Sequence, residues 1–230
     1  REAAACIATP QIRSTATIGG NLALDTRCSF YDQSELWREA QGFCLKTDED
    51  ASCRAAPGSE RCFALASGDL PPALIALGAK VRLVGPAGER EAALEEIYRD
   101  TGCSSLRLGP GELIAAVELG LSPRLSTYRK LRRRASFDFA ALGVAVALEM
   151  KGGLVSSCRI VLGALASMPI IADEAGAAMT GAAPSLERVD EAARAAVRRA
   201  RPVENSDFSA AYRRRMTGVF VARALRERNE

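Results

Sequence analysis

Four cysteines in one stretch of this chain could hold an inorganic centre. They are Cys28, Cys44, Cys53 and Cys62, and the segment that they span has few runs of core-like hydrophobic residues. A connection of this length inside a domain is usually functional or disordered. Four thiolates with little else to organise the segment predict that a metal or a cluster holds it together.

A glycine turn just ahead of the cysteines could hold a phosphate group. Its residues are Thr17, Ile18, Gly19, Gly20 and Asn21. Two adjacent glycines have no Cβ, so they permit left-handed φ values and bring backbone N–H groups close to a pyrophosphate. In this interpretation Thr17 and Asn21 add side-chain hydrogen bonds. The alternative is a turn with no ligand, which is the usual role of a Gly-Gly pair.

The spacing of the four cysteines leaves the kind of centre open. Zinc ribbons use Cys-x-x-Cys pairs and ferredoxin-type clusters also use short spacings, and the segment has neither. Widely spaced ligands in one loop can still form a four-thiolate cage. The alternative is four unrelated buried thiols, because free Cys is among the most buried residue types. The remaining cysteines are expected to lie apart from this group: Cys6, Cys103 and Cys158.

Charged residues farther along the chain offer further candidates. Asp69 precedes Pro71 and is either a helix N-cap or a carboxylate that accepts a hydrogen bond from a ligand hydroxyl. Residues 128–134 form a basic strand, which is either a solvated face or a source of cations beside a phosphate or a flavin. The charges of residues 212–215 are expected on the surface of the last helix.

Composition restricts the classes of function. The chain has 230 residues and a net charge of +3, which is enough for one or two cores and too balanced to indicate nucleic-acid binding. It has no histidine, which excludes Ser-His-Asp catalysis and histidine-ligated zinc. No apolar run approaches the roughly 18 residues that span a bilayer, so we expect no membrane contact. Without an initiator Met or a signal pattern, we expect a fragment or a processed piece in the reducing cytoplasm, with free thiols.

The elements that must position these residues form two groups. In the first group, the pattern predicts a strand or loop over 1–26, the cysteine segment over 27–68, a helix over 73–77 that Gly78 stops, a strand over 80–84, a helix over 91–98 and a strand over 112–119.

The second group begins at a boundary that we place at Ser122 and Pro123. Strands over 126–134, 140–150 and 154–162 are expected to form a β-meander. Helices follow over 187–201, N-capped by Ser185, and over 208–226, capped by Asp207. The fold class is therefore α+β, a mixed piece followed by a three-stranded antiparallel sheet with helices.

The segment from Ile12 to Leu22 resembles a known motif. It is similar to the second flavin-pyrophosphate motif in the FAD subunits of molybdenum hydroxylases, a family that includes the medium subunit of aerobic carbon monoxide dehydrogenase and the FAD domain of xanthine dehydrogenase. Further segments resemble the same family over nearly the whole chain: 69–81, 110–114, 128–134 and 212–225.

This resemblance implies a domain organisation. Residues 1–121 would be the second lobe of a two-lobed FAD-binding domain, and residues 122–230 a C-terminal domain of the carbon monoxide dehydrogenase flavoprotein type. The family's first lobe, with its own glycine-rich loop, has no counterpart here, so we expect truncation or a lobe supplied by another polypeptide.

The resemblance also implies which residues bind FAD. The five turn residues from Thr17 to Asn21 would hold the pyrophosphate, and Asp69 would contact the ribityl–isoalloxazine part. Ile114 would lie against the ring, and Lys130 would contact the flavin, with Arg129 as the alternative.

The cysteine segment, residues 27–68, is an insertion relative to most of the family. An insertion with four cysteines at this point resembles that of the β subunits of 4-hydroxybenzoyl-CoA reductases, which holds a [4Fe–4S] cluster. The resemblance therefore implies that Cys28, Cys44, Cys53 and Cys62 ligate such a cluster.

The implied function is that of an electron-transfer subunit with FAD and a [4Fe–4S] cluster and with no catalytic residue of its own. Its partners would be a large molybdopterin subunit and a small subunit with two [2Fe–2S] clusters, in a heterotrimer that dimerises, and a low-potential donor such as ferredoxin. The reaction would be the reductive dehydroxylation of 4-hydroxybenzoyl-CoA to benzoyl-CoA. Two alternatives stay open: the FAD subunit of another molybdenum hydroxylase, acting on xanthine, a heterocycle or carbon monoxide, and a non-enzymatic zinc-binding interaction module.

Overall fold

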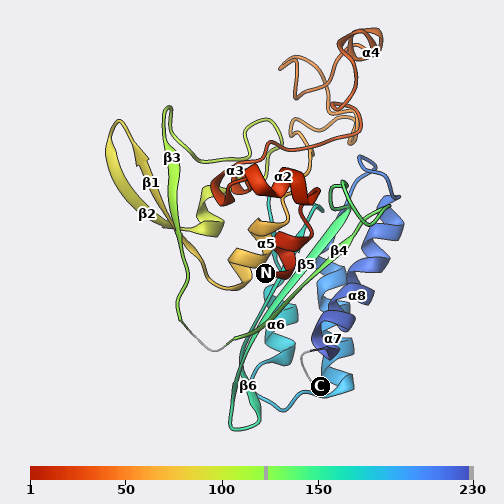
Figure 1. The fold of residues 1–230 in the computed structure, drawn as a ribbon. Helices are drawn as coiled ribbons and strands as arrows, with labels where there is room; N and C mark the ends of the chain where they lie inside the picture. Colours follow the sequence, from red (N-terminus) through yellow and green to blue (C-terminus); the bar gives the residue numbers. More distant parts are fainter. Residues whose placement is uncertain (122–123, 228–230) are drawn as a thin grey trace.

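A computed structural model of the chain describes residues 1–121 and 124–227 (Figure 1). The boundary expected at Ser122 and Pro123 lies outside the described residues. Two antiparallel sheets organise the molecule, one with three strands and one with four. Helices pack on the larger sheet, and the fold is α+β, as predicted from the sequence.

The first 22 residues form short helices, so the expectation of a strand or loop there was wrong. Threonine caps explain the difference. The side chain of Thr9 accepts a hydrogen bond from the N–H of Ile12, and Thr17 does the same for Gly20, which is the bonding pattern of a helix N-cap. The three helices are α1 (Glu2–Ala5), α2 (Pro10–Thr15) and α3 (Ile18–Leu22).

The cysteine segment projects from the body of the molecule (Figure 1). Its two ends are joined, because Arg27 and Leu65 exchange backbone hydrogen bonds of 2.9 and 2.7 Å. Helix α4 (Glu35–Ala40) lies at the outer end of the projection and starts at Ser34, whose side chain accepts from the N–H of Trp37.

The smaller sheet has the strand order β2-β1-β3. The helix expected over 91–98 is wrong in its first part, because Glu91 pairs with Arg82 in the hairpin between β1 and β2, and only residues 94–97 form a 3₁₀ helix. Helix α5 precedes this sheet and ends ahead of Gly78, whose φ of +71° closes the helix. The elements are α5 (Leu70–Ala76), β1 (Lys80–Gly85), β2 (Gly88–Ala93), the 3₁₀ helix η1 (Leu94–Ile97) and β3 (Leu113–Glu118).

The larger sheet has four strands in the order β4-β5-β6-β7, one more than expected. The fourth strand has two residues, too few to leave a pattern in the sequence. The capping of α7 by Ser185 is confirmed, whereas α8 is capped by Ser209 rather than Asp207. The elements are β4 (Leu125–Leu131), β5 (Leu142–Lys151), β6 (Leu154–Gly163), β7 (Ile170–Ile171), α6 (Asp173–Met179), α7 (Leu186–Arg199) and α8 (Ala210–Arg226).

Strand β5 is buried on both faces and joins two hydrophobic cores. Val144, Val146 and Leu148 face a core formed with α6, α7 and α8. Ala145 and Ala147 face a second core shared with α5 and the smaller sheet. Alternate residues of a strand point to opposite faces, so one strand serves both cores. The N-terminal and C-terminal parts of the chain are therefore built around a shared sheet.

Candidate functional site

The predicted glycine turn is the first turn of helix α3. Gly19 and Gly20 lie within helix α3 and neither has a positive φ, so the left-handed values that glycine permits are not adopted here. The absence of a Cβ at both positions still allows neighbouring groups to approach closely. A Cβ on Gly20 would come within 3.0 Å of the Thr17 hydroxyl, and one on Gly19 within 3.4 Å of the Ile114 carbonyl oxygen. Within the described residues, the N–H groups of Ile18 and Gly19 have no hydrogen-bond acceptor in the protein.

A hydrogen bond joins this turn to the start of helix α5. The side-chain oxygen of Asn21 accepts from the N–H of Leu70 at 3.0 Å, and Leu70 directly follows Asp69. The sequence separation between the two partners is 49 residues. The cysteine segment lies between them, so its insertion leaves the turn and Asp69 side by side.

Asp69 and Lys130 form a buried ion pair. The Lys130 ammonium lies 2.8 Å from one carboxylate oxygen of Asp69, and the two side chains are 2% and 7% exposed. The hydroxyl of Tyr128 donates to the other carboxylate oxygen at 2.8 Å. Asp69 occupies the N-cap position of α5 but makes no capping hydrogen bond, so its carboxylate serves this pair instead.

Burial dominates the electrostatics of this group. Loss of solvent raises the pKa of the Asp69 carboxyl, and the Lys130 ammonium opposes that shift. Burial also raises the pKa of the Tyr128 hydroxyl well above its usual value, and the Asp69 carboxylate adds to the shift. Tyr128 is therefore a hydrogen-bond donor at neutral pH.

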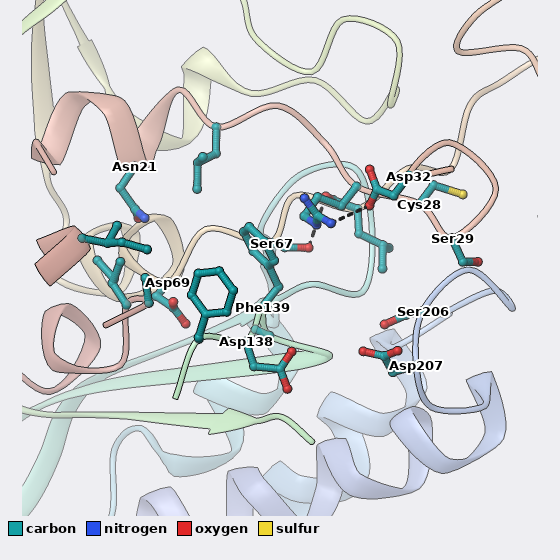
Figure 2. Close-up of a pocket in the computed structure, with 18 of the residues that line it drawn as sticks. Asn21, Cys28, Ser29, Asp32, Ser67, Asp69, Asp138, Phe139, Ser206 and Asp207 are labelled. Carbon is teal, nitrogen blue, oxygen red and sulfur yellow. Dashed lines mark hydrogen bonds and ion pairs between the residues drawn. The ribbon is translucent and has the colours of Figure 1, made fainter. Parts of the chain in front are cut away.

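A large cavity opens beside the turn, with a volume of about 780 Å³ (Figure 2). Four of the predicted flavin residues line it: Thr17, Gly20, Asn21 and Asp69. Figure 2 shows Asn21 and Asp69 at one end of this cavity and Cys28 and Asp32 at the other. Residues of the C-terminal part also line it, among them Phe139 and Asn205.

Two of the predicted flavin contacts lie away from this cavity. Lys130 lies outside the lining, with its ammonium donating to Asp69 and to the carbonyl of Cys6. Ile114 also lies outside it, on β3 against Gly19. Arg129, the alternative to Lys130, pairs with Glu227. The structure therefore assembles Asp69 with the turn, and it places Lys130 behind Asp69.

Several residues of this region were missed in the sequence. Tyr128 stands two residues before Lys130 on the same strand face, so the period of two was a usable signal. The guanidinium of Arg27 lies 4.0 Å from the centre of the Phe139 ring and pairs with Asp32 at 2.8 Å. The contact of Arg27 with Phe139 joins residues more than a hundred positions apart, and nothing local in the sequence predicts it.

Arg213 is a further correction, because it was expected on the surface and is fully buried. Its guanidinium donates to the carbonyl of Ala164 at 3.1 Å, to the carbonyl of Val203 and to the Asn205 side chain at 3.1 Å. Burial lowers its pKa to about 10, so it stays charged at neutral pH. Asn205 lines the large cavity and donates to the carbonyl of Phe63 at 2.7 Å.

The four predicted cysteine ligands meet around a second, small cavity. Cys28, Cys44, Cys53 and Cys62 are all buried and all line it. Cys28 also lines the large cavity, so it stands between the two. Burial raises the pKa of the Cys28 thiol, and it raises that of Cys62 to about 12. The four thiols converge although they are separated along the chain.

Within the described residues, no group of three or more cysteine or acidic side chains has the arrangement of a single-ion site.

Lys46 fixes the cysteine segment to the body of the molecule. Its side chain is 5% exposed, and its ammonium donates to Asp25, Thr26 and the carbonyl of Gly102, each at 2.8 Å. The same ammonium lies 4.9 Å from the centre of the Tyr31 ring. All three N–H donors of the lysine are therefore used.

The expectation that Cys103 lies apart from the four thiols was wrong. Its thiol adds to the raised pKa of Cys62 and donates to the carbonyl of Leu45, next to Cys44, at 3.3 Å. The neighbouring residue explains the approach, because the N–H of Gly102 donates to the carbonyl of Cys62 at 2.9 Å. A fifth thiol therefore stands at the edge of the group.

None of the helices in the described part of the chain is long and apolar enough to span a membrane.

Comparisons with known proteins agree with this arrangement. Residues 1–121 match the family described as the FAD binding domain in molybdopterin dehydrogenase, and residues 126–228 match the CO dehydrogenase flavoprotein C-terminal domain. The chain is 30% identical to the carbon monoxide dehydrogenase medium chain of Afipia carboxidovorans over 98% of its own length and 64% of that relative. It is 35% identical to an aldehyde oxidoreductase FAD-binding subunit of Escherichia coli over 70% of this chain and 52% of the relative.

Solved structures show the same fold. Reconstituted CO dehydrogenase from Oligotropha carboxidovorans superposes with a TM-score of 0.74 at 30% identity, covering 100% of this chain and 66% of the other. The chain thus spans less than two thirds of the length of these relatives. The resemblance read from the sequence is confirmed at the level of the family, whereas nothing among these matches singles out 4-hydroxybenzoyl-CoA reductase. The chain belongs to the FAD-binding flavoprotein family of the molybdopterin dehydrogenases, together with the medium chains of carbon monoxide dehydrogenases.

Proposed function

We propose that this chain holds FAD in the large cavity, as the flavoprotein component of a molybdenum-dependent oxidoreductase. The observation that carries the proposal is the meeting of Thr17, Gly20, Asn21 and Asp69 on the wall of one cavity of about 780 Å³. That volume lies within the range of about 300 to 1,000 Å³ that is typical of cofactor sites.

The residues present fit a flavin nucleotide. Ile18 and Gly19 offer backbone N–H groups without an acceptor in the protein, which suits a pyrophosphate. Asp69 offers a carboxylate that accepts from a ribityl hydroxyl. Lys130 and Tyr128 lie behind Asp69, where they orient its oxygens. When bound, FAD supplies the one- and two-electron chemistry, and the protein supplies binding and orientation.

A glycine substitution tests the flavin site. Gly20→Val should lower the flavin bound per chain in the purified complex, because the added Cβ meets the Thr17 hydroxyl and the branches reach the cavity. Gly120→Val is the matched control, since nothing lies within 4 Å of a Cβ there. Flavin released by heat denaturation and measured by absorbance gives the stoichiometry. Equal flavin content in the two variants would contradict the proposal.

We further propose that Cys28, Cys44, Cys53 and Cys62 ligate a [4Fe–4S] cluster. The support is that four buried thiols from a largely irregular segment line one cavity. Each thiolate of such a cluster binds a different iron, so the sulfurs stand farther apart than around one ion, and the absence of a single-ion arrangement among the described residues is compatible with it. When bound, the cluster supplies one-electron chemistry. The four cysteines would hold it, and Lys46 would fix the segment that carries them.

Iron and sulfide analysis tests the cluster. After anaerobic reconstitution, the full chain should bind four irons and four sulfides, as the proposed cluster requires. Cys44→Ser should lose most of both, whereas Cys158→Ser, on strand β6, should keep them. Equal iron in the two variants would reject the ligand assignment. Zinc without sulfide would instead support the interaction-module alternative.

The identity of the complex is a separate proposal. We propose a heterotrimer with a large molybdopterin subunit and a small subunit with [2Fe–2S] clusters, with ferredoxin or a similar low-potential donor, acting in the cytoplasm as a 4-hydroxybenzoyl-CoA reductase. The cysteine segment supports this choice. The alternative is a dehydrogenase of the type seen in the relatives, which act on carbon monoxide or an aldehyde according to their names.

Activity of the purified complex distinguishes these choices. Formation of benzoyl-CoA from 4-hydroxybenzoyl-CoA with a low-potential reductant would support the reductase. Reduction of a dye by carbon monoxide or an aldehyde, without benzoyl-CoA formation, would reject it and leave the flavin site unaffected.

A further inference from the structure

The fold places two free thiols near each other at the edge of the four-cysteine group. Burial raises the pKa of Cys62, and the nearby Cys103 thiol adds to that shift. Gly102, the residue before Cys103, packs directly on Cys62, because a Cβ on Gly102 would lie 2.6 Å from the sulfur of Cys62. Neither thiol is in a disulfide in this structure.

The approach of these two thiols is fixed from several sides. The N–H of Gly102 donates to the carbonyl of Cys62 at 2.9 Å. The carbonyl of Gly102 accepts from the Thr26 hydroxyl at 2.6 Å and from the Lys46 ammonium at 2.8 Å. The thiol of Cys103 points to the carbonyl of Leu45, at 3.3 Å, next to Cys44. The loop that carries Cys103 is therefore held on the cysteine segment.

Access to the two thiols differs. Cys103 is exposed, whereas Cys62 is 4% exposed. An accessible thiol beside a second, resolving thiol is the usual arrangement of a redox-sensing pair. Intracellular disulfides of this kind are usually transient rather than structural.

We propose that Cys62 and Cys103 form a reversible disulfide that competes with the four-thiol group for Cys62. The oxidant is a low-molecular-weight disulfide such as glutathione disulfide. The Cys103 thiolate attacks one sulfur of the reagent, forms a mixed disulfide and releases one glutathione thiolate. The Cys62 thiol then gives up its proton as its sulfur attacks the Cys103 sulfur, and the second glutathione leaves as a thiolate that takes up a proton. In total the protein gives up two electrons and two protons, and one reagent disulfide becomes two thiols.

The competition, though not the disulfide itself, rests on the proposed cluster. With Cys62 bound to Cys103, the group keeps three of its four thiols, and a [4Fe–4S] cluster loses one ligand. A cluster already in place would instead occupy Cys62 and prevent the disulfide. The exposed Cys103 would thus link cluster assembly to the redox state of the surrounding thiols.

Peptide mapping tests the disulfide directly. The reduced, iron-free full chain is treated anaerobically with glutathione disulfide, alkylated and digested with trypsin without reduction. Cleavage after Arg61, Lys80, Arg99 and Arg107 gives peptides 62–80 and 100–107, each with one cysteine. We expect these two as the main linked pair, lost on adding dithiothreitol. Recovery of Cys62 as the alkylated thiol, or its pairing mainly with Cys28, Cys44 or Cys53, would overturn the proposal.

Two variants and an iron assay complete the test. Cys103→Ser should lose every disulfide to Cys62, whereas Cys158→Ser should leave the linked pair unchanged. The oxidised wild type should bind less iron and sulfide than the reduced chain and recover after dithiothreitol. Equal uptake by the two forms would overturn the competition. The chain could also form the Cys62–Cys103 disulfide and yet bind no iron or sulfide even when reduced. That result would reject the proposed cluster and the competition, and it would still support the disulfide.

Discussion

At the level of single residues, the buried carboxylate of Asp69 depends on its charged partner Lys130. This carboxylate is buried, accepts from Tyr128 and pairs with Lys130 at 2.8 Å. A buried ion pair adds little net stability, because both partners lose their water, but loss of one partner leaves a buried charge without compensation. Lys130 therefore matters less as a ligand contact than as the counter-ion of Asp69.

Lys130→Met should lower the free energy of unfolding by about 3 kcal/mol at about pH 8. Burial already raises the pKa of Asp69, and removal of the ammonium raises it further. The folded variant then binds a proton more tightly than the unfolded chain, so the loss should shrink as the pH falls to about 5 and Asp69 becomes neutral. Urea unfolding at several pH values measures this difference.

Lys151→Met is the control for this prediction, because Lys151 is exposed at the end of β5. It should change stability by less than about 0.5 kcal/mol at every pH. A loss in Lys130→Met that does not vary with pH would show that Asp69 is not its source.

At the scale of elements, the close approach of α6 to β6 depends on one glycine. A Cβ on Gly176 would overlap the backbone carbonyl oxygen of Cys158. Backbone of a central strand cannot move aside as a side-chain end can. The helix therefore sits at a distance from the sheet that only glycine permits.

Gly176→Ala should destabilise the protein by about 1 to 3 kcal/mol, because α6 must move off the sheet. The sign of the change in the free energy of unfolding is informative, because Gly→Ala in an unhindered helix raises that free energy by about 0.5 to 1 kcal/mol. Gly218→Ala in α8 is the comparison, because its Cβ would be close only to a side-chain methyl of Val197, at 2.9 Å, while the backbone oxygen of Ala193 lies at an ordinary 3.7 Å. Thermal unfolding of both variants gives the measurement. A Gly176→Ala protein as stable as the wild type would contradict the packing argument.

Elements with a strong local signal could be predicted from the sequence, and others could not. Strand β5 was found because its run of apolar residues reflects burial on both faces. Residues 91–98 have helical spacing, but pairing with β1 overrides it. The helices before residue 23 did leave a signal in the capping threonines, Thr9 and Thr17, which the adjacent glycines obscured.

The site divides in the same way. Motifs and a family resemblance predicted Asp69, the glycine turn and the four cysteines as site residues. The structure brings Asp69 and the turn together at the large cavity, and the four cysteines together at the small one. The contact of Cys103 with Cys62 and the burial of Arg213 depend on residues far away in the chain. No local pattern encodes such contacts, because they exist only after the chain has folded.

At the scale of the whole molecule, Arg213 connects the last helix to the cysteine segment. It donates to Asn205, which in turn donates to the carbonyl of Phe63 at the end of that segment. The same guanidinium satisfies the carbonyls of Ala164 and Val203. The wall of the large cavity near Asn205 is therefore held from α8.

Arg213→Met should lower the free energy of unfolding by about 3 kcal/mol, because buried carbonyls lose their donor. Arg214→Met, one residue along the same helix and exposed, should cost less than about 0.5 kcal/mol. Limited proteolysis should also show faster cleavage near residues 203–207 in Arg213→Met alone. Equal stability of the two variants would show that the buried guanidinium is dispensable.

The large cavity also has a consequence for the order of folding. Its walls are held by contacts that span 49, 59 and 142 residues of sequence: Asn21 with Leu70, Tyr128 with Asp69, and Asn205 with Phe63. Closing such long loops costs entropy before any contact repays it, so these walls should meet late, after the local hairpins and helices have formed. A ligand that needs all of these walls cannot bind a partly folded chain. Its uptake during refolding would then lag behind the recovery of secondary structure, and it would serve as a kinetic marker of the last step.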